Sequence, residues 1–246
     1  MVRRLILMAC LALLALPAAA QSATSPRASV LTTRCHPALD ATERWAVFGG
    51  TMRSLRGGQD RMAMRFDLFR RARGSSVFKR VAAPGLGIWN RANPGVGRFK
   101  FRQKVENLSA PAAYRAVVSF RWIGADGRVF ARAHHVTLAC SQPDLRPDLR
   151  VVGIVHAGTY LVTVRNAGGS AARGFDVSFR VGGGNPVGQT VGVLGPHQWL
   201  TLTFTRPGCA DPVGATADSG SAVLESDEAN NTLTTTCASL APRRSR

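Results

Sequence analysis

Oxygen-bearing side chains gather near the C-terminus of the chain, where they could bind a metal ion. The acidic residues of this segment are Asp218, Glu225, Asp227 and Glu228, and they are followed by Asn230 and Asn231. Closely spaced carboxylates supply the hard oxygen ligands that calcium requires, although the segment lacks the regular ligand alternation and the glycine of an EF-hand loop. The alternative, which we favour, is that the asparagines hydrogen-bond to the backbone and shape the turn into the last strand. The carboxylates would then be solvated or would cap neighbouring amides.

Cations on two predicted strands in the first half of the chain form a second group that could bind a ligand. In residues 99–104, Lys100, Arg102 and Lys104 occupy alternate positions, so their side chains share one face of a strand. Arg115 and Arg121 could form similar rows on a strand at residues 114–122. Cations interleaved with aromatic residues are typical of surfaces that bind single-stranded nucleic acid or another polyanion.

The composition offers a second explanation for this charge and also narrows the expected partner. Arginine outnumbers lysine 29 to 3, which together with abundant alanine and glycine indicates GC-rich codon usage rather than a binding function. An exported protein rarely meets nucleic acid, so we do not expect that partner. An anionic wall polymer, an acidic polysaccharide, an anionic membrane surface or another envelope protein is expected instead. Phe99 and Phe101 are expected in the core, and no cofactor is expected.

Four cysteines remain once a leader that contains Cys10 is removed. They are Cys35, Cys140, Cys209 and Cys237. An even set in an exported chain indicates disulfides, and four cysteines permit three pairings. Their order favours Cys35–Cys140 and Cys209–Cys237, one bridge in each domain. A zinc site is the competing interpretation, but no CxxC or HxxxH spacing supports it.

The sequence contains no recognisable catalytic motif, and we predict that the protein is not an enzyme. A Gly-x-Ser-x-Gly elbow, a His-Glu-x-x-His helix and a phosphate-binding glycine loop are all absent from the sequence. Adjacent residues His134 and His135 should point to opposite faces of a strand, so they cannot chelate one metal together. Among fourteen acidic residues, no pair stands out for glycoside chemistry.

Residues 1–20 have the pattern of a cleaved export signal. Arg3 and Arg4 precede an apolar run at 5–16, and three alanines at 18–20 precede Gln21. The run is shorter than the roughly 20 residues that a membrane helix needs. A lipoprotein signal ending at Cys10 is the alternative, which the apolar residues beyond that cysteine disfavour. We therefore expect a secreted or cell-surface protein.

Charge divides the remainder into two units with different surfaces. Residues 34–147 contain 21 Lys and Arg against 7 Asp and Glu, whereas residues 148–241 contain 5 against 7. The tetrapeptide Pro-Asp-Leu-Arg occurs twice where the charge changes, and its prolines disfavour helix and favour extended backbone. We expect a basic domain at 34–141, a short stiff junction at 142–147 and a second domain at 148–241.

Both units show the two-residue periodicity of half-buried strands. In the first unit the alternating apolar positions are Met62, Met64, Phe66, Leu68, Tyr114, Ala116, Val118, Phe120 and Trp122; in the second they are Tyr160, Val162, Val164, Phe175, Val177, Phe179, Val181, Leu200, Leu202 and Phe204. Glycine- and proline-rich turns separate these runs, and no long helical pattern interrupts them. The fold class is therefore all-β, with two immunoglobulin-like β-sandwich domains in tandem.

Two further patterns in the first unit concern aromatic residues. Leu108, Pro111 and Tyr114 have the spacing of a tyrosine corner, in which a buried hydroxyl hydrogen-bonds back to the chain. Trp89 lies in a segment rich in glycine and proline. It could be exposed for sugar stacking, but we favour a role in plugging one end of the sandwich.

Motifs in the second unit resemble a known family. Pro147-Asp-Leu149 is followed by the strand ending at Asn166 with Gly168-Gly169, then by Ala215-Thr-Ala-Asp218 and by Glu225-Ser-Asp-Glu-Ala-Asn-Asn231. From about residue 147 to about residue 237, this order resembles the CARDB family, immunoglobulin-like modules related to cell adhesion in bacteria and archaea. The Cys209–Cys237 pair departs from the general family pattern. The resemblance implies a surface or secreted, non-enzymatic role.

The sequence thus predicts a secreted, non-catalytic adhesion or ligand-binding protein of the bacterial cell envelope. In this hypothesis the basic first domain binds an anionic polymer. The alternative is a structural spacer that has no ligand of its own.

Overall fold

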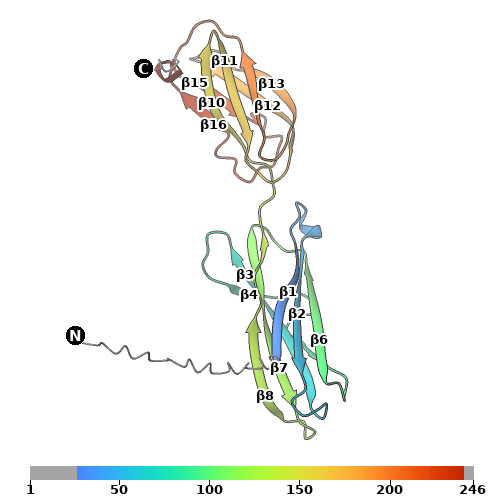
Figure 1. Cartoon of the computed structure of the whole chain (residues 1–246). Helices are drawn as coiled ribbons and strands as arrows, with labels where there is room; N and C mark the ends of the chain where they lie inside the picture. The colour runs from blue at the N-terminus through green and yellow to red at the C-terminus, as the bar shows by residue number, and fades with distance from the viewer. Residues whose placement is uncertain (1–26, 241–246) are drawn as a thin grey trace, which may run out of the picture.

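The alternating residues form two β-sandwiches joined end to end, as a computed structural model of residues 27–240 shows (Figure 1). Helical structure within these residues consists of the short turns η1 (Ala41–Glu43) and α1 (Cys237–Leu240). The tandem all-β prediction is therefore confirmed. No helix in the described part of the chain is long and apolar enough to span a bilayer. The predicted export signal lies outside the described residues.

The first domain pairs a small sheet with a larger one. Within residues 27–142 the strands are β1 (Ala28–His36), β2 (Trp45–Arg53), β3 (Arg61–Ala72), β4 (Lys79–Val81), β5 (Trp89–Arg91), β6 (Arg98–Glu106), β7 (Ala112–Ile123), β8 (Val129–Val136) and β9 (Cys140–Gln142). Strands β1-β2-β6 form what we call the small sheet. The large sheet has the order β4-β3-β7-β8, with β5 also paired to β3 and β9 to β7. Strand β1 begins at Ala28, ahead of the expected domain start at residue 34.

The alternating residues of β3 and β7 line the core between the two sheets, as predicted. All nine of the positions chosen from the sequence are buried. Trp122 is the largest of them, and its indole Nε1 donates to the Arg53 carbonyl oxygen at 2.7 Å. The Tyr114 hydroxyl donates to the Ser109 carbonyl oxygen at 3.0 Å, which confirms the tyrosine corner. The first domain therefore has a complete core of its own.

The second domain contains two sheets around a separate core. Its strands are β10 (Leu149–Ala157), β11 (Thr159–Asn166), β12 (Ala172–Val181), β13 (Val187–Leu194), β14 (Trp199–Phe204), β15 (Val213–Ala217) and β16 (Thr232–Thr235). One sheet has the order β10-β11-β14 and the other has the order β13-β12-β15-β16. Phe179 packs between Tyr160 and Phe204 in this core. Its ring is tilted against Tyr160, with centroids 4.8 Å apart, and stacked on Phe204, with centroids 5.1 Å apart.

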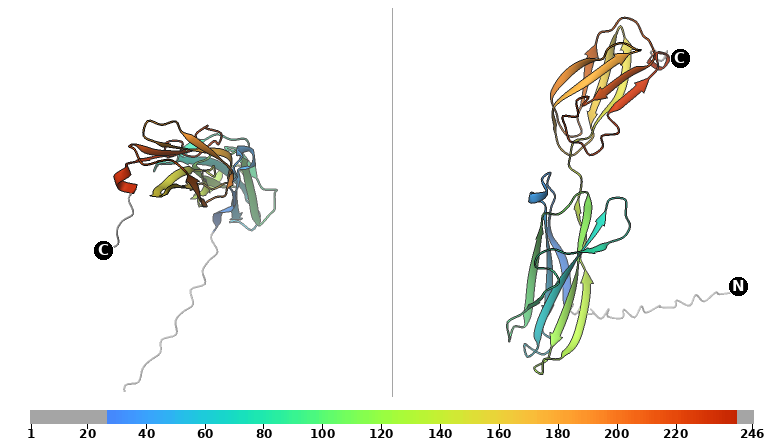
Figure 2. Two further views of the ribbon diagram at one scale, coloured as in Figure 1. Left: turned by 90° about the horizontal axis from the view of Figure 1, so that it is seen from above. Right: turned by 180° about the vertical axis from the view of Figure 1, so that it is seen from behind.

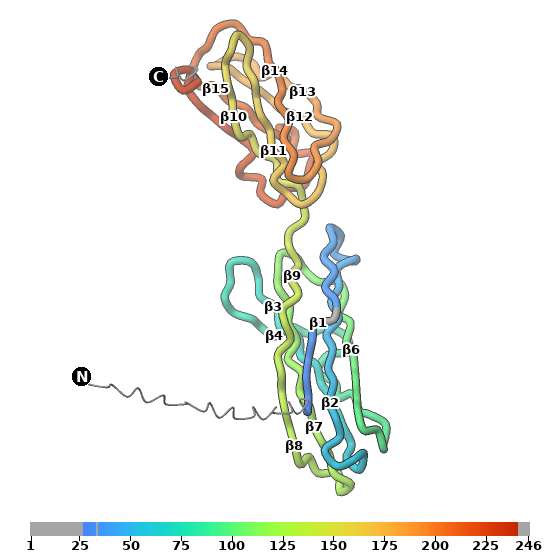
Figure 3. Tube along the Cα trace, in the orientation of Figure 1, coloured from blue at the N-terminus to red at the C-terminus, as the bar shows by residue number. Residues whose placement is uncertain are grey.

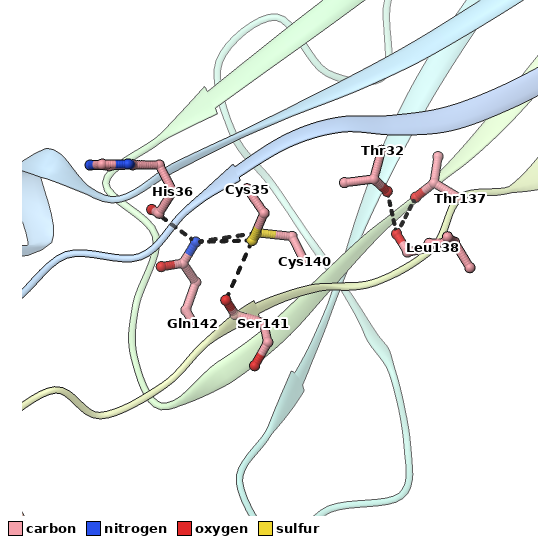
Figure 4. The surroundings of a disulfide bond; sticks show 8 residues. All are labelled: Thr32, Cys35, His36, Thr137, Leu138, Cys140, Ser141 and Gln142. Carbon is pink, nitrogen blue, oxygen red and sulfur yellow. Dashed lines mark hydrogen bonds between the residues drawn. A yellow bond between two sulfur atoms is a disulfide. The ribbon is translucent and has the colours of Figure 1, made fainter. Parts of the chain in front are cut away.

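A disulfide crosses each domain, and both pairs are the ones that the sequence order favoured. Cys35 on β1 is bonded to Cys140 on β9, so the bridge links the small sheet to the large one. Gln142 is buried beside it, and its Nε2 donates to the His36 carbonyl oxygen at 3.3 Å (Figure 4). Cys209 is bonded to Cys237 at the start of α1.

A short extended segment, residues 143–148, leads from β9 to β10 and connects the sandwiches (Figures 2 and 3). Arg146 donates to the Asp144 carboxylate through Nε and one terminal nitrogen, at 3.0 and 2.8 Å. This hydrogen-bonded pair holds the pKa of Asp144 below its ordinary value, against the opposing effect of burial.

Candidate functional site

The predicted cations of β6 lie on the outer face of the small sheet. Lys100, Arg102 and Lys104 are exposed, whereas Phe99 and Phe101 point inward and pack against the core. The alternation of charged and aromatic residues on this strand is therefore explained by the sandwich itself. The aromatic residues bury one face and the cations remain in water. Strand β6 is also an edge strand of its sheet, so its outward row is open along one side.

The structure does not join all of the predicted cations into one surface. Arg115 and Arg121 project from β7, which belongs to the large sheet, and β6 belongs to the small one. Two packed sheets turn their inner faces toward each other, so their outer faces look in opposite directions. The five predicted residues therefore divide into two basic faces. The sequence could not reveal this division because β6 pairs with the distant strand β2 rather than with its neighbour β7.

Arginine side chains cover Trp89 on the outer face of the large sheet. The Arg121 guanidinium carbon lies 3.9 Å from the centroid of the indole, and that of Arg65 lies 5.3 Å away. Trp89, on β5, lies opposite Arg65 of the neighbouring strand β3 and outside the buried core. The prediction that Trp89 plugs one end of the sandwich is therefore wrong, and Trp122 occupies the interior instead. The small side chain of Ala63, opposite Arg121, leaves room for this stacking.

A second arginine–aromatic group lies on the same sheet. The Arg115 guanidinium carbon is 4.0 Å from the centroid of the Phe78 ring, and that of Arg71 is 5.0 Å away. Phe78 immediately precedes β4, which pairs with β3 at the edge of the sheet, and its ring reaches Arg115 on β7. Cation–π contacts of this kind contribute about 0.5–1 kcal/mol at exposed sites and hold the guanidinium planes in place.

Four neighbouring strands form a shallow hollow around Trp89 and Arg121. Its volume is about 210 Å³, and its polar and aromatic lining includes Arg65, Trp89, Ser119, Arg121, Arg132 and His134. The register places Arg65, Ser119 and His134 side by side across β3, β7 and β8, and it places Arg132 directly opposite Arg121. We call this feature the Trp89 hollow. The neighbouring His135 instead contacts the Phe120 ring at 5.8 Å, so the two adjacent histidines diverge as expected.

Little negative charge balances the cations around the Trp89 hollow. Asp67 is buried on β3, and it forms ion pairs with Arg65, at 3.0 Å, and with Arg80. Among residues 27–240, neither Arg121 nor Arg132 has a carboxylate within ion-pairing distance. The site thus presents two uncompensated guanidinium groups, one stacked on a ring and one exposed to solvent.

The acidic segment of the second domain is folded as a set of backbone caps. Carboxyl oxygens of Asp218, Glu225 and Glu228 lie within 4.8 Å of one another, and Asp227 is not a member of this group. The two Asp218 oxygens each accept a backbone amide at 2.9 Å, and Glu228 accepts the Glu225 amide at 2.8 Å. These hydrogen bonds agree with the capping interpretation. Calcium binding here stays a prediction that we disfavour.

Glu225 connects this acidic segment to the first strand of its domain. Its buried carboxylate accepts the Leu149 amide and the Asn231 side-chain amide, the latter at 2.8 Å. Burial raises the pKa of Glu225 to about 7, and the nearby carboxylates of Glu228 and Asp218 act in the same direction. Asn230 also donates to a carboxylate, that of Asp148, at 2.8 Å. Both asparagine side chains therefore hydrogen-bond to carboxylates, and not to the backbone as the sequence led us to expect.

Asn166 holds the other side of the same strand end. Its buried side chain accepts the amides of Asp148 and Gly168, at 3.2 and 3.0 Å, and donates to two carbonyl oxygens. Gly168 passes so close to the junction that a Cβ there would lie 2.5 Å from the Pro147 carbonyl carbon. We call Asn166, Gly168 and Glu225 the clasp, because they fix the chain where it reaches β10. Sequence reasoning missed this role, although all three belong to the motifs quoted above.

Two fimbrial chaperone structures are similar to this chain at low TM-scores. The class 5 fimbriae chaperone CfaA matches with 11% identity over 84% of this chain and 98% of that chain, at a TM-score of 0.29. The CsuC–CsuE chaperone–tip adhesion subunit complex of Acinetobacter baumannii matches with 12% identity, 85% and 98% coverage and a TM-score of 0.26. Such scores carry no argument about this chain. No curated protein matches it by sequence.

A family model accounts for the second sandwich. The CARDB model matches residues 146–235, from the junction to the end of β16. The matched segment contains all three residues of the clasp. These residues belong to the motifs that resemble the family, and they also anchor the start of β10. The first domain lies outside the match. The second domain is thus a CARDB domain, a module of a non-enzymatic, adhesion-related family.

Proposed function

We propose that this is a secreted, non-catalytic binding protein of the bacterial cell envelope whose first domain binds an anionic polymer. The observation that carries the proposal is the outward projection of cations from both faces of the first sandwich, with few carboxylates to pair with them. The two disulfides and the adhesion-type second domain are compatible with an extracellular or surface location.

Strand geometry suits a repeating polyanion. Alternate residues of a strand are about 7 Å apart, so Lys100 and Arg102 on β6 present charges at a regular interval, whereas Lys104 at the end of the row is paired with Glu106. A flexible polymer can satisfy such a row and can reach both basic faces, which a small ligand cannot do. Binding of this kind is mainly electrostatic, so its affinity should fall steeply as salt is added.

The second domain would serve to hold the first one in place. Its own charge is nearly balanced, and the clasp fixes how the chain leaves the junction. This observation also favours the second candidate, a structural spacer that binds nothing itself. The two functions make different predictions: a binding protein is retained on an anionic polymer through its first domain, whereas a spacer is not retained.

Retention of the full chain on isolated cell walls and on immobilised heparin tests the proposal. We expect elution above physiological salt, and weaker retention of the double variant Lys100→Gln/Arg102→Gln. The matched control is Arg173→Gln/Arg180→Gln, which removes two exposed charges from the second domain and should elute with the wild type. Elution of the wild type below physiological salt on both matrices would favour the spacer.

A further inference from the structure

We propose that the Trp89 hollow binds the acidic sugars of a polysaccharide, one sugar unit at a time, through Arg121 and Arg132. This inference rests on the proposed polyanion binding and specifies where and what the first domain recognises. The outer row of β6 would then add attraction without selecting the ligand.

Arg121 is prepared for an oxyanion before any ligand arrives. Its guanidinium carbon lies over the Trp89 ring, 3.9 Å from the centroid, so less side-chain freedom remains to be lost on binding. Stacking uses the face of the guanidinium and leaves its N–H edge available. That edge matches two oxygens of a carboxylate or a sulfate in a bidentate hydrogen bond.

The pairing of Arg121 with Arg132 argues for an anion between them. These residues are direct neighbours across β7 and β8, where opposed side chains lie about 5 Å apart at Cβ. Both side chains line the Trp89 hollow, and neither has a carboxylate partner in the described part of the chain. An anion bound in the hollow would supply the missing negative charge.

The rest of the lining suits a sugar rather than a lipid chain. Ser119 and His134 supply a hydroxyl and an imidazole for sugar hydroxyls, and the half-buried Trp89 supplies a ring edge beside them. The hollow is small and lies on the face of a sheet, so it could hold one ring of an extended polymer. Apart from Trp89, its apolar lining consists of Ala133 and of Phe120, which is buried in the core and cannot insert into a bilayer.

Binding of the full chain to four probes tests the inference. These are heparin for sulfate groups, polygalacturonate for carboxylate groups, neutral dextran, and vesicles rich in phosphatidylglycerol. We expect binding to one or both acidic polysaccharides and none to dextran. Arg121→Gln should weaken that binding about tenfold or more, because charge-assisted hydrogen bonds are lost. Arg173→Gln, which removes an exposed charge from the second domain, is the matched control and should change affinity less than threefold.

A second variant protects the test against misfolding. Arg132→Gln alters an exposed residue that makes no ring contact within residues 27–240. Its thermal unfolding should therefore equal that of the wild type, while its binding falls as for Arg121→Gln. If the wild type binds neither acidic polysaccharide but is retained on isolated cell walls, polymer binding stands and the acidic sugar is the wrong ligand. If it is not retained on cell walls either, the proposed function itself fails. If it binds one acidic polysaccharide but both variants retain full affinity, polymer binding stands and the Trp89 hollow is not its site. Stronger binding to vesicles than to either polysaccharide would overturn the choice of ligand.

Discussion

Replacing Glu225 with glutamine should remove most of the pH dependence of the second domain's stability. The carboxyl group is buried, and its pKa is raised from 4.5 to about 7 in the folded state. Because the folded chain holds this proton more tightly than the unfolded chain, protonation stabilises the fold. This stabilisation is fully present below about pH 4.5 and is lost as the pH rises through about 7.

The size of the effect follows from the two pKa values. A difference of 2.5 between them corresponds to about 3 kcal/mol at most, since each unit is worth about 1.4 kcal/mol. Between about pH 5 and pH 8, the wild-type free energy of unfolding should therefore fall by about 2–3 kcal/mol through this group. Glutamine keeps an oxygen that can accept the Leu149 amide but carries no proton that titrates, so this loss should disappear in the variant.

Scanning calorimetry at several pH values measures the pH dependence of the second domain's stability, provided that the two domains unfold as separate transitions. Asp227→Asn is the matched control, because it removes one negative charge from the same segment but leaves the Leu149 bond intact. The control should keep the wild-type pH slope. Equal slopes for the wild type and Glu225→Gln, or a wild type that is flat across this range, would refute the reasoning.

Three further outcomes are expected. Gly168→Ala should lower the unfolding free energy of the second domain by about 1–3 kcal/mol in denaturant titrations, because the new methyl group meets junction backbone; an unchanged midpoint would contradict the close approach. Tyr114→Phe should cost about 1 kcal/mol in the first domain, the value of one hydrogen bond to Ser109, and should leave the second transition unmoved. Millimolar calcium should leave both melting temperatures unchanged, since the Asp218 oxygens already accept amides; a clear upward shift would reinstate the metal.

The sequence predicted local structure better than it predicted the assembly of distant parts. The burial of Met64 and Val118 follows from two-residue alternation, which needs no knowledge of partners. Disulfide pairing followed from the order of the cysteines. The division of the basic residues between two faces did not, because it depends on which strands pair. Lys100 and Arg121 look equivalent in the sequence, yet they point away from each other in the sandwich.

Side-chain partners across long separations were also out of reach. Glu225 meets Leu149 across 76 residues, and the sequence indicated only that both belong to one family pattern. Trp89 was misplaced for a related reason. Its short strand pairs with β3 beside the sheet, and arginine side chains lie over its ring.

The clasp also determines how the protein would respond to a pulling force. A load applied through the first domain reaches the second one at Asp148 and Leu149, where Asn166 and Glu225 hold the strand from both sides. The Asp148 carbonyl oxygen additionally accepts the Ala167 amide at 2.7 Å. Because these hydrogen bonds all hold the same two residues, a pulling force would load them at the same time. The first residues of β10 should therefore resist being detached from the domain. For a module anchored at one end and engaged at the other, tension would then be passed into the whole sandwich rather than concentrated on a single hydrogen bond.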